Sequence, residues 1–190
     1  MYVGEALFIR GDLDAALRHQ ISTLKSFVDG RYDGLRGQFD DDSIIATLAK
    51  EAAIAPLEVD FDNPLKDVQA ARVRVHDWGR EIEIDGVRAT RSYPFSGDAG
   101  LFDLKPNQYW SMLPRGYVSG RSIVVGIEGR NDPEMLKREL EQQEKLLRDY
   151  VASQKAQIEA HNRELTLHIA EHVARRRQHL DSVSALKDLL

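Results

Sequence analysis

Four of the six histidines lie toward the end of the chain, at successive spacings of seven, four and seven residues: His161, His168, His172 and His179. On a helix these spacings place the side chains on one face. His168 and His172 form an i, i+4 pair that could bind zinc or another divalent metal, with Glu164 as a further ligand. A small metal-dependent enzyme is therefore one hypothesis. Since Ile169 follows His168, the glutamate base of a His-Glu-x-x-His motif is missing, and we favour packing of the row at an interface, with no cofactor.

Three consecutive arginines follow this pair: Arg175, Arg176 and Arg177. Successive residues of a helix are about 100° apart, so at least one of the three faces solvent or a partner. Their structural explanation is that cations near a helix C-terminus interact favourably with the backbone dipole. Their functional explanation is contact with phosphate or nucleic acid. A net charge of −5 makes nucleic acid a weakly supported partner for the chain as a whole.

No residue is assigned a catalytic role. The chain has no cysteine, which excludes thiol nucleophiles and thiolate zinc sites. Asp40, Asp41 and Asp42 form an acidic run, but a divalent-metal nuclease site needs carboxylates that converge with a lysine or an equivalent base. No Glu-x-Lys tripeptide lies on a predicted strand, so the run is interpreted as helix capping and solvated surface.

Two helices are predicted before residue 57. Apolar residues at three- or four-residue steps predict the first from Leu13 to Asp29-Gly30, after a strand over residues 2–10. A loop is expected over 31–39, and the acidic run then caps a second helix that Pro56 stops.

Residues 57–129 show the alternation of apolar and polar residues that is typical of strands. The segments concerned are 57–61, 73–75, 82–84 and 123–127, with turns expected at 62–64, Gly79, Asp85-Gly86 and Gly97-Asp98. A mainly antiparallel sheet with one wetted face accounts for this pattern.

A long amphipathic helix is predicted after Asp132-Pro133, a strong helix-start signal. No glycine or proline occurs from Met135 to Leu190, and the apolar residues keep one phase. The segment fits either one continuous, coiled-coil-like helix or an antiparallel helical pair broken near Asn162. The sequence thus predicts an α+β protein, with a head over residues 1–130 and a helical arm over 131–190.

The apolar side of this arm needs a partner, which could be the sheet, the other half of a hairpin or a second chain. Leu165, Ile169 and Val173 are therefore candidates for a partner surface. Tyr109 and Trp110 are further candidates because aromatic residues anchor interfaces, although such residues more often close a core.

Neither a signal peptide nor a membrane span is expected. The N-terminus lacks a basic region before its short apolar stretch, and no window approaches the roughly 20 apolar residues that cross a bilayer. A cytoplasmic protein without a membrane partner is expected.

Several short motifs between residues 95 and 190 resemble the N-terminal region of a family of long bacterial proteins that carry a downstream restriction-endonuclease-like nuclease domain of the PD-(D/E)xK type. They are Phe95-Ser-Gly97-Asp98, Leu101-Phe102-Asp-Leu104-Lys-Pro106, Pro114-Arg115-Gly116, Asp132-Pro133-Glu134, Asn162-x-x-Leu165-x-x-x-Ile169 and the arginine trio. The resemblance implies a defence setting and places catalysis in a domain absent from this chain, so no catalytic residue is carried over.

The function expected from the sequence is a binding or assembly module without catalysis, through self-association or another protein. The metal-dependent enzyme and nucleic-acid recognition by the arginines remain the alternatives.

Overall fold

The computed structural model describes residues 1–77, 79–108 and 110–189, with all side chains in these ranges except those of residues 76, 77, 188 and 189. It is an α+β protein with a mainly antiparallel sheet and a long C-terminal helix, as the sequence predicts. The chain forms two compact units, and they divide it differently from the predicted head and arm. Unit 1 contains Met1–Leu13 and Pro56–Lys155, and unit 2 contains Asp14–Ala55 and Ala156–Leu190.

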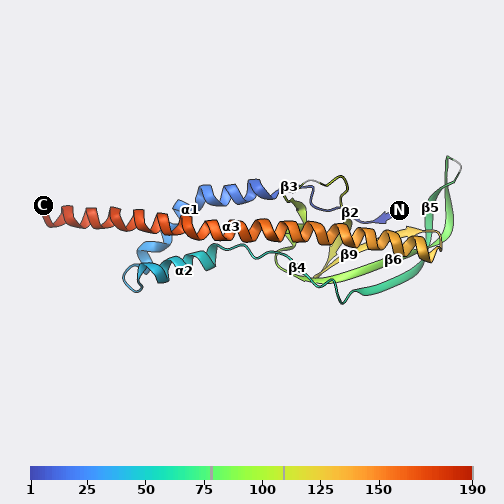
Figure 1. The fold of residues 1–190 in the computed structure, drawn as a ribbon, viewed down its shortest axis with the longest axis horizontal. Coiled ribbons are helices and arrows are strands. Elements are labelled where there is room, and N and C mark those ends of the chain that lie inside the picture. Colours follow the sequence, from blue (N-terminus) through green and yellow to red (C-terminus); the bar gives the residue numbers. More distant parts are fainter. Residues whose placement is uncertain (78, 109, 190) are drawn as a thin grey trace. The chain divides into compact units, whose positions relative to one another are not determined.

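The last helix, α3 (Pro133–Leu189), is a single helix of 57 residues without a break at Asn162 (Figure 1). It begins where the sequence indicates, because Asp132 Oδ1 accepts a hydrogen bond from Met135 N at 3.1 Å. Its apolar stripe is buried along most of its length: Leu136, Leu140, Leu147, Val151, Ile158, Leu165, Ile169 and Val173. Of the two predicted alternatives, the continuous helix is therefore the one observed.

Unit 1 is built on a seven-stranded sheet in the order β2-β8-β9-β6-β4, with β1 pairing to β9 and β5 pairing to β6. Its strands, all paired antiparallel, are β1 (Tyr2–Val3), β2 (Glu5–Ala6), β4 (Glu58–Val59), β5 (Leu65–Asp77), β6 (Arg80–Ser96), β8 (Arg115–Ser119) and β9 (Ser122–Gly129). A separate parallel pair joins β3 (Gly11–Asp12) to β7 (Leu104–Lys105), just after the short 3-10 helix η1 (Ala99–Asp103).

The first part of α3 supplies the core of unit 1. Leu136 and Leu140 pack with Ala89 of β6 and Ile127 of β9. Further along, the ring of Tyr150 stacks on Phe8 with ring centroids 5.0 Å apart. One turn beyond, the buried Gln154 Nε2 donates hydrogen bonds to the carbonyl oxygens of Leu101 at 2.8 Å and Leu104 at 3.0 Å. This amide fixes the backbone around η1 to the helix.

Unit 2 is a cluster of three helical segments: α1 (Leu13–Leu35), α2 (Asp41–Ala52) and the part of α3 from Ala156 onward. Their shared core consists of Leu24, Val28, Tyr32, Ile44, Leu48, Leu165, Ile169 and Val173. Asn162 supports it, because its amide accepts from Ile54 N at 3.1 Å and donates to Ile54 O at 2.8 Å. The residue that the sequence marks as a possible break is thus a polar clamp on the segment after α2.

The predicted boundaries at two glycines are wrong. α1 continues through Gly30 to Leu35, where a loop is expected, because Val28 and Tyr32 keep it packed in the core. Asp85-Gly86 lies inside β6 rather than in a turn. Gly86 is required there because a Cβ atom would overlap the carbonyl oxygen of Gly129 and a methyl group of Val73. Among the described helices, none is long and apolar enough to cross a membrane.

The two glycines provide a matched test of this fold. At Gly30 an added Cβ meets nothing within 4 Å, so Gly30→Ala should stabilise unit 2 by about 0.5–1 kcal/mol through helix propensity. Gly86→Ala should destabilise unit 1, because either β9 or the Val73 side chain must move. Urea denaturation of both variants measures this, and a loss of stability in Gly30→Ala would contradict the extended α1.

Candidate functional site

The predicted histidine row is divided between different environments. His161 is buried and its Nε2 lies 2.7 Å from Gln20 Oε1, and burial lowers its pKa. His168 and His172 are half-buried, whereas His179 and Glu164 are exposed. Among the described residues no group of three or more histidines or carboxylates is arranged to hold a metal ion. The structure therefore gives the His168, His172 and Glu164 set no visible metal geometry.

All three arginines of the trio pair with carboxylates inside unit 2. Arg176 makes a two-pronged contact with Asp33, with Nε 3.0 Å from Oδ1 and Nη2 2.6 Å from Oδ2. Arg177 reaches Asp41 at 2.9 Å, and Arg175 reaches Glu171 at 3.4 Å. Two of them therefore tie α3 to α1 and to α2, a role that the sequence does not reveal.

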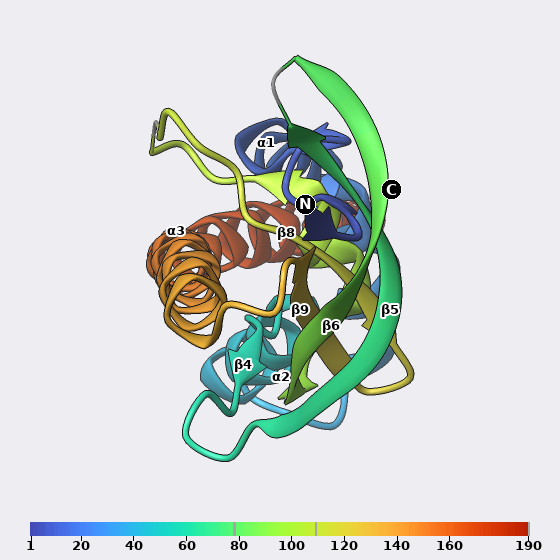
Figure 2. The same ribbon diagram turned by 90° about the vertical axis from the view of Figure 1, so that its right-hand side faces the viewer.

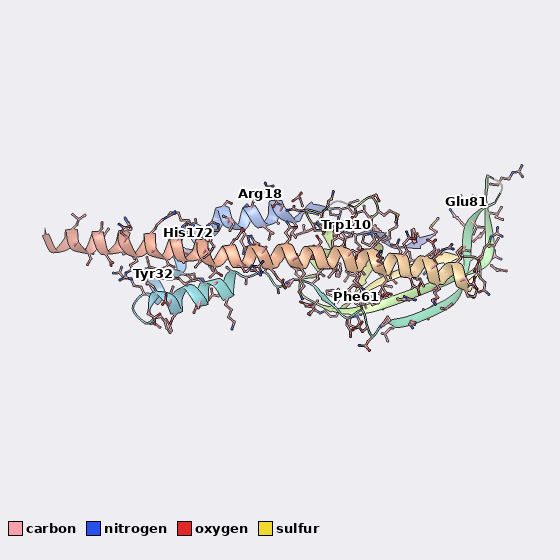
Figure 3. All side chains as sticks on the ribbon, in the orientation of Figure 1. Arg18, Tyr32, Phe61, Glu81, Trp110 and His172 are labelled. Carbon is pink, nitrogen blue, oxygen red and sulfur yellow. The ribbon has the colours of Figure 1, made fainter. Side chains whose placement is uncertain are left out.

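The predicted partner surface is mostly internal. Leu165, Ile169 and Val173 are buried against α1 and α2, so the chain's own helices cover them and they are not exposed to a partner. Trp110, labelled in Figure 3, stacks on Tyr150 with ring centroids 4.3 Å apart. Tyr109 lies outside the described residues.

A charged network joins α3 to the sheet of unit 1. Glu144 Oε2 accepts hydrogen bonds from Arg91 Nη1 at 2.6 Å and from Tyr93 OH at 2.7 Å, and Oε1 accepts from Arg148 Nη2 at 3.0 Å. The Arg148 guanidinium also lies over the Phe61 ring, 4.3 Å from its centroid. These donors satisfy a carboxylate that is largely withdrawn from water.

The network also shifts the pKa values of Glu144 and Tyr93. Burial alone would raise the pKa of Glu144, but the hydrogen bonds from Tyr93, Arg148 and Arg91 outweigh it, and the pKa lies below its ordinary value. Burial, and then the bond to Glu144, raises the pKa of Tyr93. Glu144 therefore stays ionised and Tyr93 stays protonated at neutral pH, and the hydrogen bond between them is kept.

The outermost feature of unit 1 is β5, which pairs with β6 and with no other strand in the described part of the chain (Figure 2). Its other edge offers unpaired backbone groups over a strand of 13 residues. Residues 65–70 are all exposed, and Leu65 and Val68 keep 70% and 67% of their surface accessible. A long exposed edge with apolar side chains is the usual template for an added strand.

Alternation along β5 separates its side chains by chemistry. One face carries Lys66, Val68, Ala70, Arg72 and Arg74, all exposed. Across the strand pair, Arg72 and Arg74 lie opposite the acidic Asp85 and Glu83 of β6. On this face β5 itself carries basic side chains, of which Arg72 Nε lies 3.7 Å from Asp85 Oδ1 of β6.

A groove adjoins this edge. It is lined by Val68, Val87 and Ala89 from the sheet and by Pro133, Leu136 and Leu140 from α3, with a volume of about 280 Å³. Arg91 of the Glu144 network also lines it, so the network fixes one wall. An apolar groove beside an unpaired strand edge combines the two elements of peptide recognition by strand addition. We call this combination the β5 edge site.

Comparison with protein-family models, with curated proteins and with solved structures finds no match for this chain.

No pattern in the sequence predicts the β5 edge site. Only residues 73–75 show the strand pattern, in a strand that begins at Leu65, because Lys66 to Arg72 lack clear apolar alternation. Strand pairing and edge position depend on contacts distant in sequence, so they had no local signal.

The charged network around Glu144 predicts that the stability of the protein depends on pH. Glu144→Gln should cost about 1–3 kcal/mol at pH 7, since the carboxylate loses charge-assisted hydrogen bonds. Because the folded pKa lies below the ordinary value of 4.5, this stability is present above that value and is lost as pH falls through the folded pKa. Urea denaturation at several pH values should show the gap between wild type and variant closing in acid. Glu141→Gln, at an exposed position of the same helix, should show little gap at any pH.

Proposed function

We propose that this chain is a protein-binding module that accepts an extended segment of a partner protein at the β5 edge site. The observation that carries the proposal is the unpaired edge of the 13-residue strand β5, with exposed Leu65 and Val68. Strand addition would satisfy the free backbone groups of β5 by main-chain hydrogen bonds, while side chains on alternate positions set specificity.

The chemistry of the edge indicates an acidic and apolar partner segment. Side chains of an added strand that lie beside Lys66, Arg72 and Arg74 are favourable when they carry carboxylates. The opposite face of β5 carries the exposed Leu65, the half-buried Val75 and the buried Val73, with the polar Asp67 and Gln69 between them. Its accessible apolar residues, Leu65 and Val75, favour apolar neighbours. A segment that alternates acidic and apolar residues matches both faces.

A second copy of this chain fits the edge less well. Two-fold antiparallel pairing of β5 with itself sets the same face of both strands together, so the basic residues of one copy would lie close to those of the other. Like charges facing each other across strands are destabilising. The proposal therefore commits to a different protein as the partner.

The motif resemblance over residues 95–190 extends the proposal. In a protein with a downstream restriction-endonuclease-like domain, this module would recognise a partner for the nuclease in a defence setting. That context rests on the motifs alone and remains a prediction.

The proposal is tested with synthetic peptides of about ten residues that alternate valine with glutamate or valine with lysine. The glutamate peptide should bind and slow hydrogen exchange at the amides of β5. A triple charge reversal, Lys66→Glu, Arg72→Glu and Arg74→Glu, should weaken that binding by about tenfold or more and shift preference to the lysine peptide.

The control uses two equally exposed apolar residues, since Val68 on β5 and Leu167 on α3 both keep 67% of their surface accessible. Val68→Glu should weaken binding of the glutamate peptide, because it places a like charge on the basic face that the glutamates of the peptide contact, and Leu167→Glu should not. Unchanged exchange at β5 with both peptides, or equal effects of the two glutamate variants, would contradict the proposal.

A further inference from the structure

A second hollow, in unit 2, is lined entirely by ionisable side chains. Lys25 and Asp29 come from α1, and His172, Arg175, Arg176 and His179 come from α3. Its volume is about 300 Å³, and His172, labelled in Figure 3, lies on its α3 wall. Small-ligand sites are concave, and the polar groups that converge in them orient the ligand.

Positive charge dominates among the side chains that line this hollow, although the chain carries a net charge of −5. Three permanent cations, Lys25, Arg175 and Arg176, face one carboxylate, Asp29. Asp29 Oδ2 accepts from Lys25 Nζ at 2.7 Å, and Arg176 is held by Asp33. A concave basic surface raises the local concentration of small anions.

Arg175 is the cation that is held most loosely. Within the described part of the chain its one ion pair is with Glu171, at 3.4 Å, and both side chains are more than half exposed. Exposed pairs of this kind contribute little to stability. Arg175 can therefore turn toward a ligand at low cost, while Arg176 keeps its structural bond to Asp33.

We propose that this hollow binds a phosphate group, either as inorganic phosphate or as the terminal group of a small phosphate ester. A phosphate dianion presents oxygens that the Arg175 guanidinium, the Lys25 ammonium and an imidazole N–H of His172 can approach from two helices. Charge-assisted hydrogen bonds from several directions select a compact dianion over a planar carboxylate. The site is independent of the β5 edge site.

His172 couples this binding to pH. Its neighbours are Lys25 and Asp29 on α1 and His168, Glu171 and Arg175 on α3. Burial, and then the charge of Arg175, lowers the pKa of His172, so the ring is neutral at pH 7 in the free protein. A bound dianion favours the imidazolium and raises this pKa, so affinity for an anion that stays a dianion should increase as pH falls.

The test titrates the full chain with inorganic phosphate, glycerol 3-phosphate and sulfate by calorimetry, and follows the His172 ring by NMR. Sulfate remains a dianion between about pH 5 and 8, so the change of its affinity with pH reports the protein alone. All three anions should bind and raise the pKa of His172. Tighter binding of glycerol 3-phosphate than of inorganic phosphate would indicate an ester ligand, and the reverse would indicate free phosphate.

A matched pair of double variants distinguishes the loss of donors in the hollow from a general effect of net charge. Lys25→Gln with Arg175→Gln should weaken phosphate binding about tenfold or more, since each removed donor made a charge-assisted bond. Arg18→Gln with Arg163→Gln makes the same change in net charge on the same two helices, at exposed positions outside the hollow, and should leave affinity within about twofold.

Three results would overturn the inference: no binding of any of the anions, equal losses in the two double variants, or a His172 pKa that phosphate does not move. Duplex DNA that binds more tightly than the small anions and loses affinity in both double variants would also overturn it, because the basic side chains would then be an extended nucleic-acid surface.

Discussion

The apolar side of α3 has to be covered along nearly its whole length, because it is unfavourable to expose this many leucine, isoleucine and valine side chains to water. Leu136, Leu140, Leu147 and Val151 are covered within unit 1, and Ile158, Leu165, Ile169 and Val173 within unit 2. A sheet does so in the first unit and two shorter helices in the second. Because α3 continues unbroken from Pro133 to Leu189, it cannot cover its own apolar side, and other segments of the chain do so.

Polar interactions then fix the positions of neighbouring elements along α3, which the apolar stripe alone does not determine. A continuous stripe allows a neighbouring element to slide along the helix, whereas hydrogen bonds with one geometry do not. Glu144 binds Arg91 and Tyr93 of the sheet, Asn162 clamps the backbone at Ile54, and Arg176 grips Asp33. The buried Gln154 serves the same purpose near η1. Two surfaces are not used by these contacts and are the proposed binding sites: the unpaired edge of β5 and the basic hollow beside His172.

The sequence predicted the elements that have a strong local signal. Asp132-Pro133 marked the start of α3, and the apolar positions from Leu136 to Val173 marked its buried side, because helix periodicity is a property of nearby residues. It failed at Gly30 and Gly86, where tertiary packing overrides the usual role of glycine. Lys66 to Arg72 gave no strand signal, and the arginine trio gave no sign of its partners Asp33 and Asp41. Those outcomes depend on residues far away in the sequence, which periodicity and spacing do not encode.

The continuity of α3 is the central claim, and a distance between two spin labels tests it most directly. The chain has no cysteine, so Ala156→Cys with Ala174→Cys, both at exposed positions of α3 within unit 2, allows specific labelling. One uninterrupted helix places these Cα atoms about 27 Å apart, at 1.5 Å per residue, and predicts a single narrow distance distribution by pulsed electron paramagnetic resonance. A hairpin broken near Asn162 would bring the two sites side by side, with helix axes about 10 Å apart. That short distance would contradict the account of how both cores are built.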